Sequence, residues 1–176
     1  APDNPNVLWV AAQGALHGPN KERGIYKSVD GGKTWKNVLF VNELTGAADL
    51  SIDTHNPQVL YAAMWEHQRL PWQVVSGGPG SGLYKSTDGG ESWFKIHKGL
   101  PEEKGKMAIA VSKANPEIVY ALIESDSEKE KGGLFLSKNA GKSWSKISGD
   151  HRLIQRAWYY IEVFPDPNDE NTVYVL

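Results

Sequence analysis

One short motif occurs three times along the chain and constrains its fold more than any other feature. Each copy is a run of small, apolar and aromatic residues, then a polar stretch rich in Asp, Asn and Gly, and finally a Trp. The copies are residues 24–35, 82–93 and 133–144. Asp and Asn can accept backbone hydrogen bonds, and Gly supplies the positive φ of a tight turn. We therefore predict three β-hairpins, each ending on a Trp that folds back onto the apolar face of the hairpin.

A second element alternates with these hairpins. It is a turn rich in Asn and Pro followed by a β-branched strand with one aromatic residue, at Trp9, Tyr61, Tyr120 and Tyr174. A further extended run is expected before the later copies, at about residues 47–52, 107–111 and 158–164. Repeats of four strands over about 40–50 residues are typical of β-propeller blades. The sequence predicts an all-β fold: a β-propeller segment of about three to three and a half four-stranded antiparallel blades.

The repeat also predicts the limits of the blades. Residues 1–45 would form a partial blade, residues 46–104 and 105–156 two blades, and residues 157–176 the first two strands of the next. A propeller needs several blades to close its ring, and an open arc leaves its end blades unpaired. We therefore expect the segment to be part of a longer chain, or to contact propeller blades of a partner chain.

Charge and composition argue against several classes of function. The formal net charge is −2 and the basic residues are scattered, so neither nucleic acid nor an anionic membrane is an expected partner. No apolar run approaches the about 20 residues that a membrane helix needs, so no membrane insertion is expected. Cys is absent and the five His show no ligand spacing, so we expect no metal site and no cofactor.

The hairpin motif resembles the Asp-box, also called the BNR repeat, with the pattern S-x-D-x-G-x-[ST]-W. Two copies match in full, and the third carries Asn in place of Asp. The matching residues are Ser28, Asp30, Gly32 and Trp35; Ser86, Asp88, Gly90 and Trp93; and Ser137, Asn139, Gly141 and Trp144. In Asp-box families the box is structural, which implies that these residues hold turns and perform no catalysis or metal binding.

Asp-box propellers include sialidases, xyloglucan-cleaving hydrolases, sortilin-type receptors and a photosystem assembly factor. The chain most resembles the bacterial sortilin-like proteins often labelled glycosyl hydrolases. The stretches 68–72, 76–82 and 156–160 carry that likeness. The resemblance implies a protein that is secreted, periplasmic or at the cell surface, although no signal peptide is recognisable in the sequence.

In a propeller, the loops between the second and third strands of each blade share one face with the connections between blades. We call this the loop face; the Asp-boxes lie on the opposite one. The long loops expected there are about residues 13–23, 66–81 and 124–131, and the last is a charge run expected to be solvated. The candidate ligand-binding residues on the loop face are Trp65, His67, Arg69, Trp72, Arg152, Arg156 and Trp158.

Exposed aromatic rings beside Arg and His suit stacking on a sugar or clamping a peptide. The alternative is structural: Trp65 and Trp72 would pack a long loop, and Arg156 would pair with a neighbouring blade. Glycoside hydrolysis usually needs two carboxylates roughly 5–10 Å apart. Glu66 and Asp150 are the candidates on the loop face, but neither lies in a motif that matches a hydrolase catalytic residue.

The sequence therefore favours a ligand-binding part of a sortilin-like propeller, with a peptide, a protein or a glycan as ligand. The first alternative is a fragment of a secreted, xyloglucanase-like glycoside hydrolase whose catalytic residues lie partly outside this segment. The second is an assembly or scaffold factor. The motifs that can be identified are structural, and no complete catalytic set is visible, so binding is the preferred hypothesis.

Overall fold

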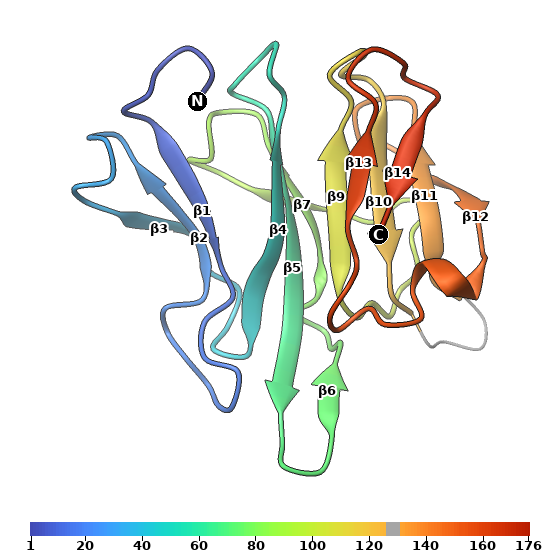
Figure 1. Ribbon diagram of the computed structural model, residues 1–176. Helices are drawn as coiled ribbons and strands as arrows, with labels where there is room; N and C mark the ends of the chain where they lie inside the picture. Colours follow the sequence, from blue (N-terminus) through green and yellow to red (C-terminus); the bar gives the residue numbers. More distant parts are fainter. Residues whose placement is uncertain (126–130) are drawn as a thin grey trace.

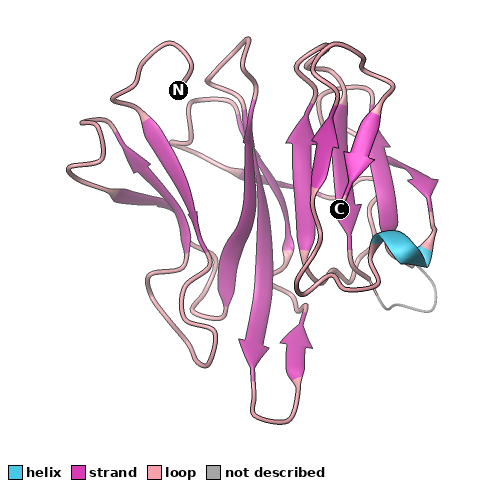
Figure 2. Cartoon of the chain, in the orientation of Figure 1, coloured by secondary structure: helices cyan, strands magenta, loops and turns pink. Residues whose placement is uncertain are grey.

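The computed structural model describes residues 1–125 and 131–176, which form four antiparallel sheets (Figures 1 and 2). The first sheet contains β1 (Leu8–Ala12), β2 (Gly24–Ser28) and β3 (Lys36–Leu39). The second contains β4 (Thr45–Ile52), β5 (Leu60–Arg69), β7 (Gly82–Ser86) and β8 (Phe94–Ile96), and β6 (Val74–Ser76) pairs with the end of β5. The third contains β9 (Met107–Val111), β10 (Val119–Ile123), β11 (Gly133–Ser137) and β12 (Ser145–Ser148). The fourth contains β13 (Val163–Pro165) and β14 (Val173–Val175), and the 3₁₀ turn η1 (His151–Leu153) precedes it.

The sheets stand side by side in chain order, and their first strands meet: β4 lies against β9, and β9 against β13 (Figure 1). Strand order within each sheet follows the sequence, apart from the added β6. This arrangement confirms the predicted all-β propeller segment. The blade limits at residues 45, 104 and 156 stay a prediction. The strand pairing shows which strands form each sheet, but it does not show at which residue of a connection one blade ends and the next begins.

Apolar side chains from consecutive sheets form the core. Along β10, Val119, Ala121 and Ile123 join the cluster shared with the second sheet, whereas Tyr120 and Leu122 join the cluster shared with the fourth. Successive side chains of a strand point to opposite faces, so a strand between two sheets is apolar at every position. This explains why the central strands read as continuous hydrophobic runs.

Hydrogen bonds within each Asp-box close the turn between the last two strands of a sheet. In the second box, Asp88 Oδ1 accepts bonds from Ser86 Oγ (2.7 Å) and Ser92 N (2.9 Å). Gly90 N donates to Ser86 Oγ (2.8 Å), and Trp93 Nε1 donates to the Gly90 carbonyl (3.1 Å). The other two boxes repeat the bonds between their Ser, Asp or Asn, and Gly residues. The turn is thus held within eight residues of sequence.

Two segments differ from the sequence-based expectation. The loop expected at residues 66–81 instead continues β5 as far as Arg69, and the chain then returns as β6. The extended run expected at residues 158–164 is mostly turn: Tyr159 N and Tyr160 N both donate to the Arg156 carbonyl (2.9 and 2.8 Å). These local bonds delay the strand until Val163, so the connection folds over the end of the neighbouring sheets.

Candidate functional site

The β5–β6 hairpin projects from the loop face, at the bottom of Figure 1. Trp65 and His67 lie on the same side of β5, and their rings stack with centroids 4.2 Å apart. Trp65 Nε1 donates to Ser76 Oγ on β6 (3.0 Å), and both aromatic side chains are buried. These contacts support the packing role that was the alternative to ligand binding, since neither ring reaches the surface.

A buried arginine fixes the same hairpin from the first sheet. Arg23 Nη1 donates to the Leu44 carbonyl (2.8 Å) and lies 3.1 Å from His67 Nδ1. Arg23 Nη2 donates to the Ala15 carbonyl (2.5 Å). Burial lowers the pKa of His67, and the positive charge of Arg23 adds to this effect. The imidazole is therefore held neutral, as an anchor between the first and second sheets.

Two of the candidate arginines converge on a tyrosine that was not among the candidates. Arg69 Nη1 and Nη2 both lie 3.4 Å from Tyr159 Oη and donate to it, and the Arg156 guanidinium lies 5.2 Å from the Tyr159 ring centroid. The hydrogen bonds from Arg69 lower the pKa of Tyr159. Residues 90 positions apart are thus brought together on the loop face, and the aromatic run at residues 158–160 was the available signal.

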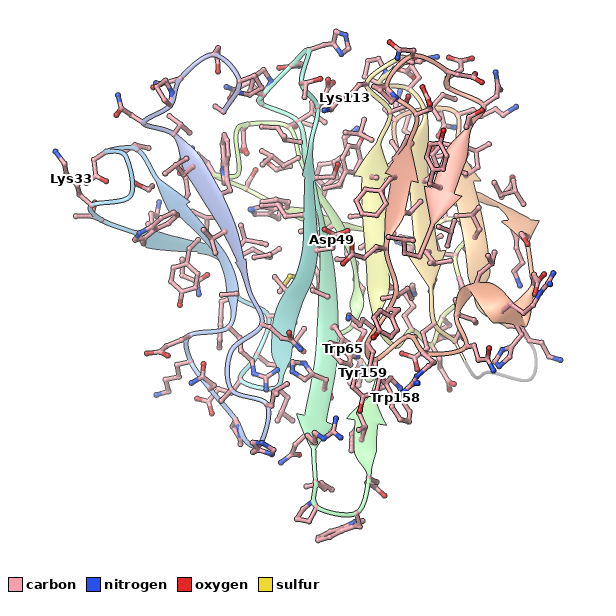
Figure 3. All side chains as sticks on the ribbon, viewed as in Figure 1. Lys33, Asp49, Trp65, Lys113, Trp158 and Tyr159 are labelled. Carbon is pink, nitrogen blue, oxygen red and sulfur yellow. The ribbon has the colours of Figure 1, made fainter. Side chains whose placement is uncertain are left out.

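A buried carboxylate links three segments beside this group. Glu124 Oε1 accepts a hydrogen bond from Trp158 Nε1 (2.9 Å). Glu124 Oε2 accepts bonds from Ser76 Oγ (2.6 Å) and Lys106 N (2.7 Å). Figure 3 shows Trp65, Trp158 and Tyr159 gathered at this end of β5. The expectation that Glu124 belongs to a solvated loop is corrected, because its carboxylate is buried and has three donors. Residues 126–130 of that charge run lie outside the described residues.

A cavity of about 650 Å³ opens next to Glu124, between the second and third sheets. Its walls are residues 76–79, 102–105 and 124–125. One wall offers an unused polar group, since Ser125 Oγ is buried and has no hydrogen-bond partner. At another wall the backbone lies close against the carboxylate, since a Cβ on Gly105 would lie 2.2 Å from Glu124 Oε2. The cavity is therefore partly polar, with backbone close to its carboxylate.

The remaining candidates lie apart from this cavity or are engaged elsewhere. Asp150 is ion-paired with Arg152 (2.5 Å from Oδ2 to Nη2), and the hydrogen bonds from Arg152 lower the pKa of Asp150 to about 2. Glu66 Oε2 accepts a bond from Gly80 N (2.8 Å). Trp72, in the connection between β5 and β6, is 76% exposed. Glu66 and Asp150 thus have separate partners and do not form one pair of interacting carboxylates.

A family model decides what this chain is related to. The model of sortilin, neurotensin receptor 3 (Sortilin-Vps10) matches residues 23–176, which is most of the chain. The chain belongs to the Sortilin-Vps10 family. A search of curated proteins finds no match.

Solved structures of GH74 enzymes resemble this Sortilin-Vps10 segment. The GH74 xyloglucanase from Xanthomonas campestris is 18% identical, with a TM-score of 0.62, over 88% of this chain and 23% of the enzyme. An ancestral GH74 enzyme is 21% identical (TM-score 0.63, 94% of this chain, 19% of the enzyme). The GH74 enzyme of Niastella koreensis is 19% identical (TM-score 0.62, 97% of this chain, 25% of the enzyme). At these identities the likeness shows the propeller fold alone. The chain spans about a fifth to a quarter of these proteins, so a complete propeller needs blades from elsewhere.

Neither a group of metal ligands nor a membrane-spanning helix is found in the described part of this Sortilin-Vps10 segment. No three His, Asp or Glu side chains of residues 1–125 and 131–176 are grouped as metal ligands would be. In the same residues, no helix has the length and apolar character needed to cross a membrane. What the loop face does present is a fixed indole, two guanidinium groups and a cavity with a buried carboxylate.

Proposed function

We propose that this Sortilin-Vps10 segment binds a ligand on its loop face, in the cavity beside Glu124 and against the ring of Trp158. The observation that supports this most is the state of Trp158. Its indole is 46% exposed, yet its Nε1 is fixed by the buried Glu124 carboxylate, which lines the cavity. A rigid, half-exposed aromatic ring beside a concave polar surface loses little conformational entropy when it contacts a ligand.

The charge of the cavity favours a peptide or protein segment with a basic side chain. Glu102, Glu103 and Glu124 line it, with Lys104 as the basic residue of the same wall. A cationic group near several carboxylates gains electrostatic energy, and in a concave site less of that energy is screened by water. The family description, that of a receptor, agrees with a binding role. Such a role suits a secreted, periplasmic or cell-surface protein.

Glycan hydrolysis is less well supported by this segment. Both hypothesised catalytic groups are engaged with other residues, Glu66 with Gly80 and Asp150 with Arg152. The low pKa of Asp150 keeps it ionised near neutral pH, whereas a general acid must be protonated. Enzyme activity would therefore require carboxylates other than these two.

Selection from a random-peptide display library on the immobilised intact protein tests the proposal. We expect enrichment of peptides with Lys or Arg, and about tenfold weaker binding of a selected peptide after Trp158→Ala. Phe94→Ala is the matched control, because Phe94 is an exposed aromatic residue on the outer strand β8 of the second sheet. Unchanged affinity in Trp158→Ala would contradict the site. If the protein released reducing sugar from xyloglucan, and the Glu66→Gln variant did not, the result would support hydrolysis instead of ligand binding as the function.

A further inference from the structure

A second groove lies between the second and third sheets, on the side of the Asp-boxes and away from the loop face. Its volume is about 370 Å³. It is lined by Lys85 and Thr87 at the start of the second box, by residues 94–98 on and after β8, and by residues 140–142 of the third box. The Phe94 ring in its wall is half-exposed, and Ile96 beside it is buried. The groove therefore combines an apolar surface with polar side chains of two consecutive blades.

The charged residues of this groove are all basic. They include Lys85, Lys98 and Lys142, and no Asp or Glu lines the groove. Among residues 1–125 and 131–176, none of these three lysines forms an ion pair. A fourth lysine is engaged outside the groove, because Lys95 Nζ donates to the Pro79 carbonyl (3.3 Å). Three ammonium groups thus belong to one concave surface without a carboxylate bound to them.

Lys85 and Lys142 repel each other across the groove. Burial lowers the pKa of the Lys85 ammonium, and the positive charge of Lys142 lowers it further. The charges of Glu117 and Asp53 oppose this shift, but their effect is smaller than that of Lys142. Lys85 Nζ donates to the Ala140 carbonyl (2.7 Å), which uses one of its three N–H donors. The ammonium is therefore held in place and still has donors for an anion.

The contact between the first and second sheets has the same geometry and allows a comparison. Trp9 Nε1 and Tyr61 Oη each donate to the carbonyl that follows the Asp or Asn of the next box, both at 3.1 Å. A lysine adjoins each ring: Lys27 Nζ lies 5.8 Å from the Trp9 centroid, and Lys85 Nζ lies 5.3 Å from the Tyr61 centroid. The contact between the third and fourth sheets differs, because Leu136 stands at the position of these lysines. The comparison therefore concerns the first two contacts.

At the first contact a carboxylate neutralises the lysine. Glu91 of the second box pairs with Lys27 (2.7 Å) and with Lys36 (3.4 Å). The third box has Lys142 at the position of Glu91, five residues after the Ser of the box. Phe94 stands at the position of Lys36, directly after the Trp of its box. The second contact thus keeps the lysine, replaces its carboxylate by a positive charge and adds an aromatic ring.

We propose that this groove binds an acidic peptide segment, with a Glu or Asp carboxylate between Lys85 and Lys142 and a neighbouring apolar side chain against Phe94. The carboxylate would occupy the place that Glu91 has at the first contact. Bringing an anion between two ammonium groups relieves their repulsion and adds two attractions in a partly desolvated site. The groove lies on the face opposite to the proposed ligand site, so either site can fail without the other.

Surface plasmon resonance of the intact protein tests the proposal. The probe is an immobilised peptide of alternating Glu and Leu residues, with blocked ends so that only its side chains are charged. We expect Lys142→Glu to weaken binding at least about tenfold, since the new carboxylate can pair with Lys85 and close the site. Lys138→Glu is the matched control, because Lys138 is an exposed residue of the same box outside the groove and its variant has the same net charge. This control should bind as the unchanged protein does.

Three results would overturn the proposal. Equal losses in Lys142→Glu and Lys138→Glu would show a general charge effect without a site. Equal binding of a peptide with Gln in place of Glu would exclude carboxylate recognition. Tighter binding of heparin than of the peptide, with the same loss in Lys142→Glu, would identify a sulfated glycan as the occupant.

Thermal unfolding of the same variant provides an independent check. We expect the melting temperature of Lys142→Glu to be equal to or above that of the unchanged protein, because an attraction replaces the repulsion at Lys85. A lower melting temperature would contradict the equivalence of the two contacts and the proposal with it. Binding of a basic peptide on the loop face should be unchanged in this variant.

Discussion

At the residue scale, the Asp of each box acts as a charged acceptor for its own turn. Asp30 accepts hydrogen bonds from Thr34 Oγ1 (2.6 Å), Thr34 N (2.9 Å) and Ser28 Oγ (2.8 Å). Donors to a carboxylate favour its ionised form. These bonds, led by that of the Thr34 hydroxyl, lower the pKa of Asp30 to about 2. In the third box Asn139 stands in place of the Asp. Its uncharged amide oxygen Oδ1 accepts a hydrogen bond from Ser143 N (2.9 Å).

This difference predicts that the boxes respond differently to acid. A carboxyl whose folded-state pKa is lowered adds stability that is present above its unfolded pKa, near 4, and is lost as the pH falls through the folded value. For Asp30 the loss should extend from about pH 4 to about pH 2. Hydrogen exchange should show falling protection of the Thr34 amide over this range and constant protection of the Ser143 amide. Parallel behaviour of the two amides would contradict the assignment.

At the scale of elements, the β5–β6 hairpin is a pair of strands in a region that the sequence predicted to be an irregular loop. His67 and Arg69 of β5 pair with Ser76 and Val74 of β6. Buried Trp65 and His67 hold the base of the hairpin to the sheet. A two-stranded hairpin is only marginally stable by itself, so this packing is what keeps it ordered. Its tip, with exposed Trp72, makes little contribution to that packing.

Two tryptophans of this element should therefore differ strongly when each is truncated. Trp65→Ala removes a buried ring and should cost about 3–5 kcal/mol of unfolding free energy. Trp72→Ala alters an exposed side chain and should change the unfolding free energy by less than about 0.5 kcal/mol. Urea denaturation of the intact protein gives both values. A comparable loss for Trp72→Ala would show that the tip is packed against other blades.

At the scale of the whole molecule, side chains join the inner edges of consecutive blades. Asp49 Oδ2 on β4 accepts a hydrogen bond from Ile109 N on β9 (2.8 Å), and Ser51 Oγ accepts one from Val111 N (3.0 Å). Figure 3 shows Asp49 between these two strands. The N–H groups of an inner edge strand would otherwise lack partners. Burial raises the pKa of Asp49, and the hydrogen bonds from the Ile109 and Leu50 N–H groups oppose that rise by favouring the ionised carboxylate.

Removing one of these acceptors should weaken the whole arc. Ser51→Ala leaves the Val111 N–H without a partner in a poorly solvated junction, and we expect a loss of about 1–3 kcal/mol in unfolding free energy. Ser145→Ala, at an exposed position on the outer strand β12, is the matched control and should be close to neutral. Denaturant midpoints of the two variants provide the comparison. Equal midpoints would mean that water satisfies the amide and that the junction does not need the serine.

Local chemistry was sufficient for the fold and for part of the candidate site. Turn residues and two-residue periodicity act over a few positions, so the three hairpins and the blade order could be predicted. The placement of Arg69, Arg156 and Trp158 on one face followed from the blade order. The role of Glu124 did not, because nothing in its immediate sequence distinguishes a buried carboxylate from a solvated one. The aromatic run at residues 158–160 marked the region of Tyr159 but could not show that Arg69, 90 positions away, contacts this residue.

The repeated hairpin by itself determined the propeller class, because each Asp-box closes its turn with bonds inside eight residues. Only the tertiary structure decided which side chains are buried between blades and which remain exposed on the loop face. Glu124 is held by Ser76, 48 positions away, and by Trp158, 34 positions away. Such contacts depend on how whole sheets pack together, and burial at a junction between sheets is a property of both partners, which no short stretch of sequence encodes.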